Sequence, residues 1–105
     1  MTGCCQVTTT LPDSTAADRL AQALVGERLA ACAQVSGPIT STYRWQSAVE
    51  QAGECYCHLK TTLKRLPALQ ARIRELHPYQ VPEIIAVPIV DGDSSYLRWI
   101  EDSVE

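Results

Sequence analysis

Two stretches of the chain repeat their apolar residues at helical spacing, and each lies between stretches that alternate every second residue. The first helical stretch runs from about Thr15 to Ala31, and the second runs from Leu66 to Leu76 and ends at His77-Pro78. Each carries one apolar stripe, which has to be buried against a sheet. Asp13 or Ser14 can cap the first helix, and Thr15 with Asp18 resembles a capping box for that helix. Its stripe consists of Ala17, Leu20, Ala21, Leu24 and Val25.

Four stretches have the composition of β-strands, and they span residues 4–10, 33–46, 54–61 and 81–89. The second is long for a strand, and Gly37-Pro38 interrupts it, which predicts a bulge or bend. The polar residues Ser47–Gly53 then connect it to the third strand, so the two are expected to form an extended hairpin. Asp91-Gly92-Asp93 predicts a turn before a short closing helix, which is expected to contain Tyr96, Leu97, Trp99 and Ile100.

This order predicts an α+β fold of the ferredoxin-like, split β-α-β kind. Two helices would cover one face of a four-stranded antiparallel sheet, and a short C-terminal helix would follow. With 105 residues, 46% of them apolar, we expect a single domain over residues 1–105. The second sheet face and the open strand edges favour association with further copies of the chain.

Charge and hydropathy exclude several classes of partner. The formal charge of -3 gives no field that would attract a nucleic acid, and no apolar run approaches the ~18 residues of a membrane span. Met1-Thr2-Gly3 leads directly into strand-like sequence, without the basic and apolar regions of a signal peptide. We therefore expect a cytoplasmic protein without nucleic-acid or membrane partners.

The five cysteines are an odd number, and with no signal peptide they predict free thiols rather than a disulfide framework. Cys55 and Cys57 have the spacing of a soft-metal clip. Strand alternation offers a second explanation, in which both thiols and Leu59 face the core while Glu54, Tyr56, His58 and Lys60 face the other way. We favour packing in the core over metal binding.

Catalytic signatures are absent from the sequence. It contains two histidines, neither with a neighbour that indicates a triad, and it has no Gly-rich phosphate loop, H-E-x-x-H or C-x-x-C spacing. Cys32 follows the C-terminal end of the first predicted helix, where the helix dipole disfavours a thiolate, so we interpret it as a packing residue. We predict that the chain is not an enzyme. The basic residues Lys60, Lys64, Arg65, Arg72 and Arg74 are interpreted as a solvated surface.

The sequence resembles the CutA divalent-cation-tolerance family over nearly its whole length. The resemblance rests on the stretches "ALVGERLAACAQV", "ITSTYRW", "LKTT", "ELHPYQVPEIIAVPI" and "YLRWI", which occur in the family's order and spacing. It implies a ferredoxin-like subunit in a tight homotrimer, in which the long hairpin reaches a neighbour. Tyr43, Arg44 and Trp45 could stack on a flat ligand, but the resemblance favours an intersubunit contact. It further implies a role in tolerance of copper and other divalent cations.

The segment after the second helix contains the residues that bear on metal binding. Family members with assigned copper ligands carry a cysteine after the first strand and a His-His pair before Pro-Tyr. This chain has Thr9 and Leu76 at two of those three positions, which leaves His77 as the candidate metal ligand. One imidazole makes a poor site, so His77 would need Glu83, a thiol, or the same residue of neighbouring subunits. We expect weak, pH-dependent binding of copper or another divalent cation.

Structural roles for the same segment compete with metal binding. Pro78 would end the helix, and Pro82 and Pro88 would lie at a sheet edge or bulge. Glu83 would be either solvated or paired with Arg44 or Lys60. Two alternative functions also remain: a trimeric small-molecule module resembling the PII signal proteins, and a structural scaffold without catalysis.

Overall fold

The computed structural model describes residues 2–105. The elements follow the predicted order: β1 (Cys4–Leu11), α1 (Ser14–Gly26), β2 (Cys32–Trp45), β3 (Ala48–Thr62), α2 (Leu66–Leu76), β4 (Ile85–Pro88) and α3 (Ser94–Ser103). None of the helices in this part of the chain is long and apolar enough to cross a membrane.

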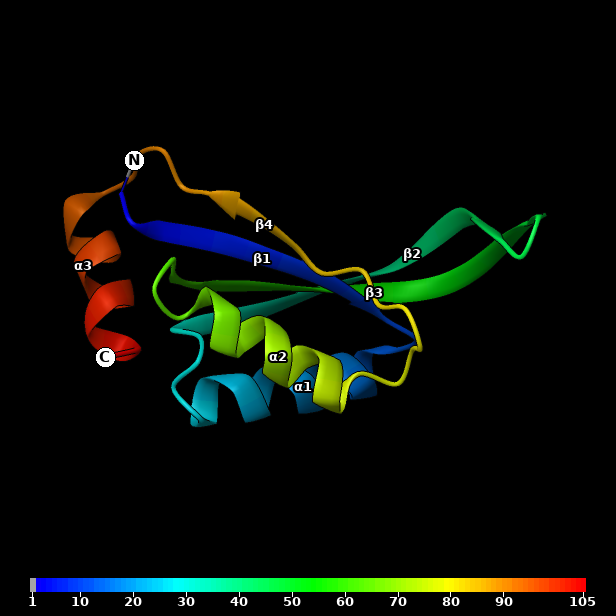
Figure 1. The fold of residues 1–105 in the computed structure, drawn as a ribbon, viewed down its shortest axis with the longest axis horizontal. Coiled ribbons are helices and arrows are strands. Elements are labelled where there is room, and N and C mark those ends of the chain that lie inside the picture. The colour runs from blue at the N-terminus through cyan, green and yellow to red at the C-terminus, as the bar shows by residue number, and fades with distance from the viewer. Residues whose placement is uncertain (1) are drawn as a thin grey trace.

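The four strands form one sheet in the order β2-β3-β1-β4, and all neighbouring strands are antiparallel. As a result β1 and β2 run parallel with β3 between them, and β3 and β4 run parallel with β1 between them. This is the split β-α-β arrangement, so the predicted α+β fold class is confirmed. Helices α1 and α2 cover one face of the sheet (Figure 1).

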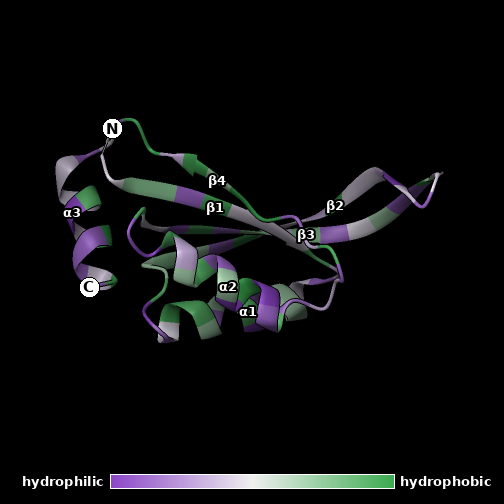
Figure 2. Cartoon of the chain, viewed as in Figure 1, coloured by the Kyte–Doolittle hydropathy of each residue, from purple (hydrophilic) through white to green (hydrophobic). Residues whose placement is uncertain are grey.

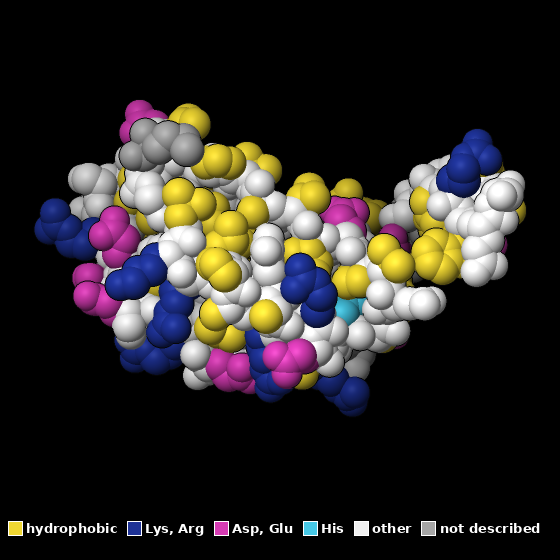
Figure 3. Space-filling view, in the orientation of Figure 1, with side chains coloured by type: hydrophobic (Ala, Val, Ile, Leu, Met, Phe, Trp, Pro, Cys, Tyr) yellow, Lys and Arg dark blue, Asp and Glu magenta, His cyan; other side chains and the backbone are white. Residues whose placement is uncertain are grey.

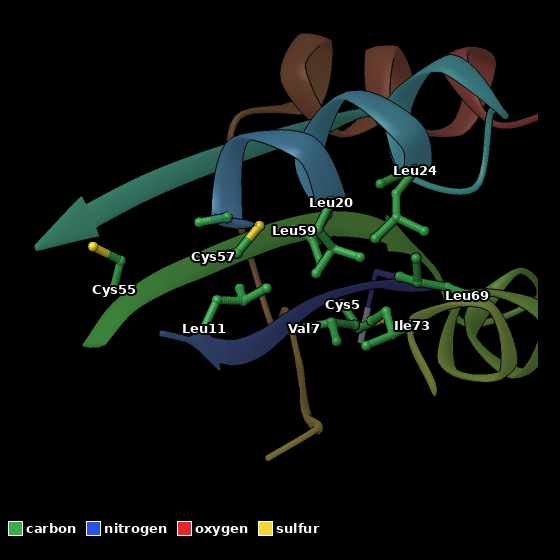
Figure 4. Packing of buried hydrophobic residues seen from close by; sticks show 12 residues of the cluster. Cys5, Val7, Leu11, Leu20, Leu24, Cys55, Cys57, Leu59, Leu69 and Ile73 are labelled. Carbon is green, nitrogen blue, oxygen red and sulfur yellow. The ribbon is translucent and has the colours of Figure 1, made fainter. Parts of the chain in front are cut away.

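The main core lies between that face and the two helices. The pairing of β1 with β3 places Val7 opposite Leu59, and both are fully buried. Figure 4 shows their side chains pointing into the same space as Leu24 of α1 and Ile73 of α2. Each such side chain contributes roughly 1.5–3 kcal/mol to folding when it is fully buried.

The second sheet face is covered only at one end. Cys4 alternates with Cys5, so it points away from the main core and packs against Ile100 of α3 and Val104, which directly follows that helix. Figure 1 shows α3 at the end of the sheet that holds the N-terminus. Within residues 2–105, no helix covers the remainder of this face.

Helix α1 is shorter than predicted. Its N-cap is Asp13, one of the two residues predicted to cap it, and Asp13 Oδ1 accepts a hydrogen bond from the backbone N–H of Ala16 at 2.8 Å. The expected capping box of Thr15 and Asp18 therefore does not form. The helix ends at Gly26, and Arg28 takes a left-handed φ of 61°. The chain must turn there because Ala31 already donates its N–H to the sheet, at Lys60 O.

Strands β2 and β3 extend beyond the body of the molecule as a long hairpin (Figure 1). Its turn contains only Gln46 and Ser47, with φ of 48° and 71°, so the predicted polar connection Ser47–Gly53 is wrong. Two left-handed residues give a turn whose twist matches that of the strands, and the polar residues that follow can pair as exposed strand. The predicted interruption at Gly37-Pro38 is confirmed as a register shift between Ser36 and Ile39.

Strand β4 is also shorter than predicted, because only Ile85–Pro88 pair with β1. Pro82 precedes the strand and Pro88 ends it, and β4 lies at the edge of the sheet, where a missing N–H is tolerated. Its ribbon is hydrophobic in Figure 2. Even so, Val87 is 57% exposed.

Candidate functional site

His77 directly follows α2, and its side chain is only 8% exposed. The imidazole Nε2 lies 2.8 Å from the backbone oxygen of Thr10 and 3.1 Å from Thr9 Oγ1. The other nitrogen, Nδ1, accepts a hydrogen bond from the backbone N–H of Tyr79 at 3.1 Å. Because Nδ1 is the acceptor, we assign the proton of the neutral ring to Nε2, which donates to Thr10.

Burial lowers the pKa of His77 below its ordinary value, although the Thr10 carbonyl and the charge of Glu54 act in the opposite direction. Desolvation disfavours the charged imidazolium, so the neutral ring is the form that fits this site. A metal ion would have to take the Nδ1 lone pair from Tyr79.

Tyr79 connects this imidazole to the long hairpin. Its hydroxyl donates to Glu54 Oε2 at 2.7 Å, and its ring centroid lies 4.9 Å from that of His77. Burial raises the pKa of the Tyr79 phenol, and the bond to Glu54 raises that pKa further, so the phenol remains a donor. The site is therefore a chain of hydrogen bonds from Thr10 of β1 through His77 and Tyr79 to Glu54 of β3.

Glu54 is a residue of this site that the sequence reasoning missed. Strand alternation placed Glu54 on the face opposite Cys55 and Cys57, but it gave no sign that the residue is only 7% exposed. Its carboxylate contacts Tyr79, in the segment after α2, and no local pattern in the sequence indicates that contact.

The other candidate ligands do not join His77. Glu83 is exposed and forms no ion pair with Arg44 or Lys60 within residues 2–105, while Lys60 donates to the Gln34 side chain instead. Leu76 is exposed, and Thr9 is buried with its hydroxyl against His77. In the described part of the chain, no three His, Cys, Asp or Glu side chains gather as a metal site.

The cysteines are all free thiols. Cys55 and Cys57 are buried in the main core, as the alternation predicted. Cys32 is placed differently from the prediction: it begins β2 instead of following a helix, and its Sγ lies 3.6 Å from the Tyr96 hydroxyl. The helix ends earlier than expected, so its dipole does not bear on this thiol.

The sequence profile described as CutA1 divalent ion tolerance protein matches residues 5–103. The chain belongs to the CutA1 divalent ion tolerance family. The family resemblance of the sequence is thus confirmed. The family description names no catalytic activity, in agreement with the prediction that the chain is not an enzyme.

Relatives from several organisms agree with this assignment. The divalent-cation tolerance protein CutA of Thermus thermophilus is 45% identical over 94 residues, which are 90% of this chain and 91% of that protein. The solved structure of the Thermus protein superposes with a TM-score of 0.94 at 42% identity, over 97% of this chain and 99% of that one. Human protein CutA is 38% identical over 96 residues, which are 91% of this chain but 54% of the human protein.

One solved CutA1 family structure bears on cellular location. The Archaeoglobus fulgidus protein, 31% identical over 97% of this chain and 99% of that one with a TM-score of 0.93, is described as a periplasmic divalent cation tolerance protein. The cytoplasmic location of the present chain stays a prediction.

Proposed function

We propose that this CutA1 family protein acts in tolerance of divalent cations, copper among them, as a homotrimer that binds such cations weakly. The observation that carries the proposal is the family match over residues 5–103, which includes both the hairpin and the His77 segment. The relatives from Thermus and Escherichia coli are both described as divalent-cation tolerance proteins.

Apolar side chains outside the core support self-association. Tyr43, Trp45 and Val49 are exposed on the long hairpin, and Ile85 and Val87 are exposed on β4. Figure 3 shows hydrophobic side chains along the border of the molecule where β4 runs. Exposed apolar surface on this scale, beside an open strand edge, favours burial against another copy.

The environment of His77 supports weak rather than tight cation binding. Both of its nitrogens already have hydrogen-bond partners, and Thr9 and Leu76 supply neither a thiolate nor an imidazole beside it. Selective binding of copper or zinc needs several convergent nitrogen or sulfur donors. Such a set would require Glu83, a thiol, or His77 of neighbouring subunits.

Calorimetric titration with Cu²⁺ and with Zn²⁺ tests the proposal on protein purified without a chelator or affinity tag. We expect weak binding that decreases as the pH falls and is reduced by His77→Ala. His58→Ala is the matched control, because His58 is the second histidine of the chain and lies elsewhere, beside Thr8. Tight stoichiometric binding that survives His77→Ala would contradict the assignment of the ligand. No binding at all would favour the small-molecule or scaffold alternatives.

We also propose a cytoplasmic location. It is supported by the five free thiols, which are typical of a reducing compartment.

A further inference from the structure

Contacts within the long hairpin do not determine the angle at which it leaves the rest of the molecule. We call residues 39–54 the arm; Ile39 pairs with Glu54 at its base, and Gln46 and Ser47 form its tip. Figure 1 shows it projecting past the layer formed by the other strands and helices. Strand pairing holds the two halves of the arm together, but that pairing does not set the angle between the arm and the body.

The joint between arm and body is an interruption of the β-ladder. The register of β2 and β3 shifts between Ser36 and Ile39, so the regular pairing that would continue the sheet into the arm is lost there. Gly53 pairs with Thr40 just beyond the joint and has no side chain with which to pack. A bulge bends a strand locally, and its direction then depends on what packs beside it.

The hydrogen-bond chain of the candidate site ends at this joint. Glu54, at the base of the arm, accepts from the Tyr79 hydroxyl at 2.7 Å, and the backbone of Tyr79 donates to His77, which donates to Thr10 at the end of β1. Bonds to an ionised acceptor are among the stronger hydrogen bonds in proteins. The segment that follows α2 thereby links the end of β1 to the base of the arm, one residue beyond the last pair of β1 with β3, Leu11 with Cys55.

From this geometry we infer that Tyr79 and Glu54 are positioning residues: their bond sets the direction of the arm and presents Tyr43 and Trp45 to a second copy of the chain. The inference rests on the proposed self-association. It adds to that proposal the residues of the same chain that prepare the arm for docking. A preorganised arm loses less freedom on association than one that is free to swing at its joint.

The test is the dissociation constant of the assembly, measured by sedimentation across a dilution series. Tyr79→Phe removes only the hydroxyl and should weaken association about tenfold, because an arm freed at its joint has to be ordered again on association. Glu54→Gln keeps an acceptor and should have a smaller effect. The double variant should be no weaker than Tyr79→Phe alone.

Tyr96→Phe is the matched control. It is the same chemical change, and it also removes a hydroxyl contact, to Cys32, but on α3 away from the arm. Amide exchange in β1 and in residues 55–62 of β3 should be unchanged in all variants, which shows that the body remains folded. Association of Tyr79→Phe as tight as that of the wild type would overturn the inference.

A second measurement separates this inference from the proposed assembly. A monomeric wild type would contradict the proposed self-association, but not the positioning role of Tyr79 and Glu54. In a Trp99→Phe background Trp45 is the sole tryptophan, so its time-resolved anisotropy reports motion of the arm. When Tyr79→Phe is introduced into this Trp99→Phe background, the fast angular motion of Trp45 should increase. Unchanged motion would overturn the positioning role even in a monomer.

Discussion

The neutral imidazole of His77 links stability to pH. The unfolded chain has an ordinary histidine pKa near 6.5, and burial lowers the pKa in the folded chain. Between these two values the unfolded state binds a proton that the folded state does not. The free energy of unfolding is therefore fully retained above about pH 6.5 and decreases as the pH falls toward the folded pKa.

His77→Gln should remove this dependence. We expect the difference in unfolding free energy between wild type and variant to fall with pH below about 6.5, by at most about 1.4 kcal/mol per pH unit for one proton. Urea unfolding at a series of pH values measures it. Parallel curves for the two proteins across that range would contradict the account.

Cys57 is predicted to react very slowly with alkylating reagents. It is fully buried, and burial together with the charge of Asp18 raises its pKa to about 11. Because the thiolate is the reactive form, alkylation of Cys57 should occur only through opening of the core. Mass spectrometry after iodoacetamide labelling checks this, with the partly exposed Cys32 as reference. Equal labelling rates for the two thiols would be evidence against it.

At the scale of single residues, the sequence correctly predicted which side chains face the core where strand alternation alone determines it. Cys55 and Cys57 faced the core as expected, because both faces of β3 follow from a period of two. The alternation also placed Glu54 on the opposite face, but it could not predict that Tyr79, 25 positions along the chain, contacts the carboxylate there. The sequence predicted His77 as a candidate metal ligand, but it could not predict that both ring nitrogens already have hydrogen-bond partners.

At the scale of elements, the joint of the arm depends on Gly37. Its φ is 136°, and a Cβ added there would meet Cys55 Sγ at 3.1 Å and the Cys55 Cα at 3.2 Å. Gly37→Ala should therefore destabilise the chain by about 2 kcal/mol or more.

Gly53→Ala is the matched control, since it lies in the same hairpin and an added Cβ meets nothing within 4 Å. It should be nearly neutral. Thermal unfolding followed by circular dichroism compares the two variants. Equal stability of Gly37→Ala and Gly53→Ala would show that the joint tolerates a side chain.

Elements were predicted well where the signals were local. Helix α2 has a helical period, Pro67 in its first turn and His77-Pro78 at its end, and its predicted bounds are confirmed. The end of α1 and the length of β4 were wrong, because each is set by a pairing partner distant in sequence: Lys60 for the chain after α1, and β1 for β4. The tight turn at Gln46 and Ser47 was missed because neither residue is a glycine or asparagine.

At the scale of the whole molecule, Trp45 is the residue whose loss should most affect assembly. Its side chain is 38% exposed on the arm of a single chain. If a neighbouring copy buries it, Trp45→Ala should cost on the order of 3 kcal/mol of stability in the associated state. Chemical unfolding at a fixed protein concentration measures this. A loss below about 0.5 kcal/mol would indicate a side chain that no neighbour covers.

The molar mass in solution tests the central claim most directly, because a homotrimer is the form in which the arm and β4 would bury their apolar side chains. Light scattering should be recorded on the wild type over a dilution series that reaches micromolar concentration. The account predicts three times the 11.5 kDa of one chain at every concentration above the dissociation constant. A stable species of 11.5 kDa throughout the series would contradict it.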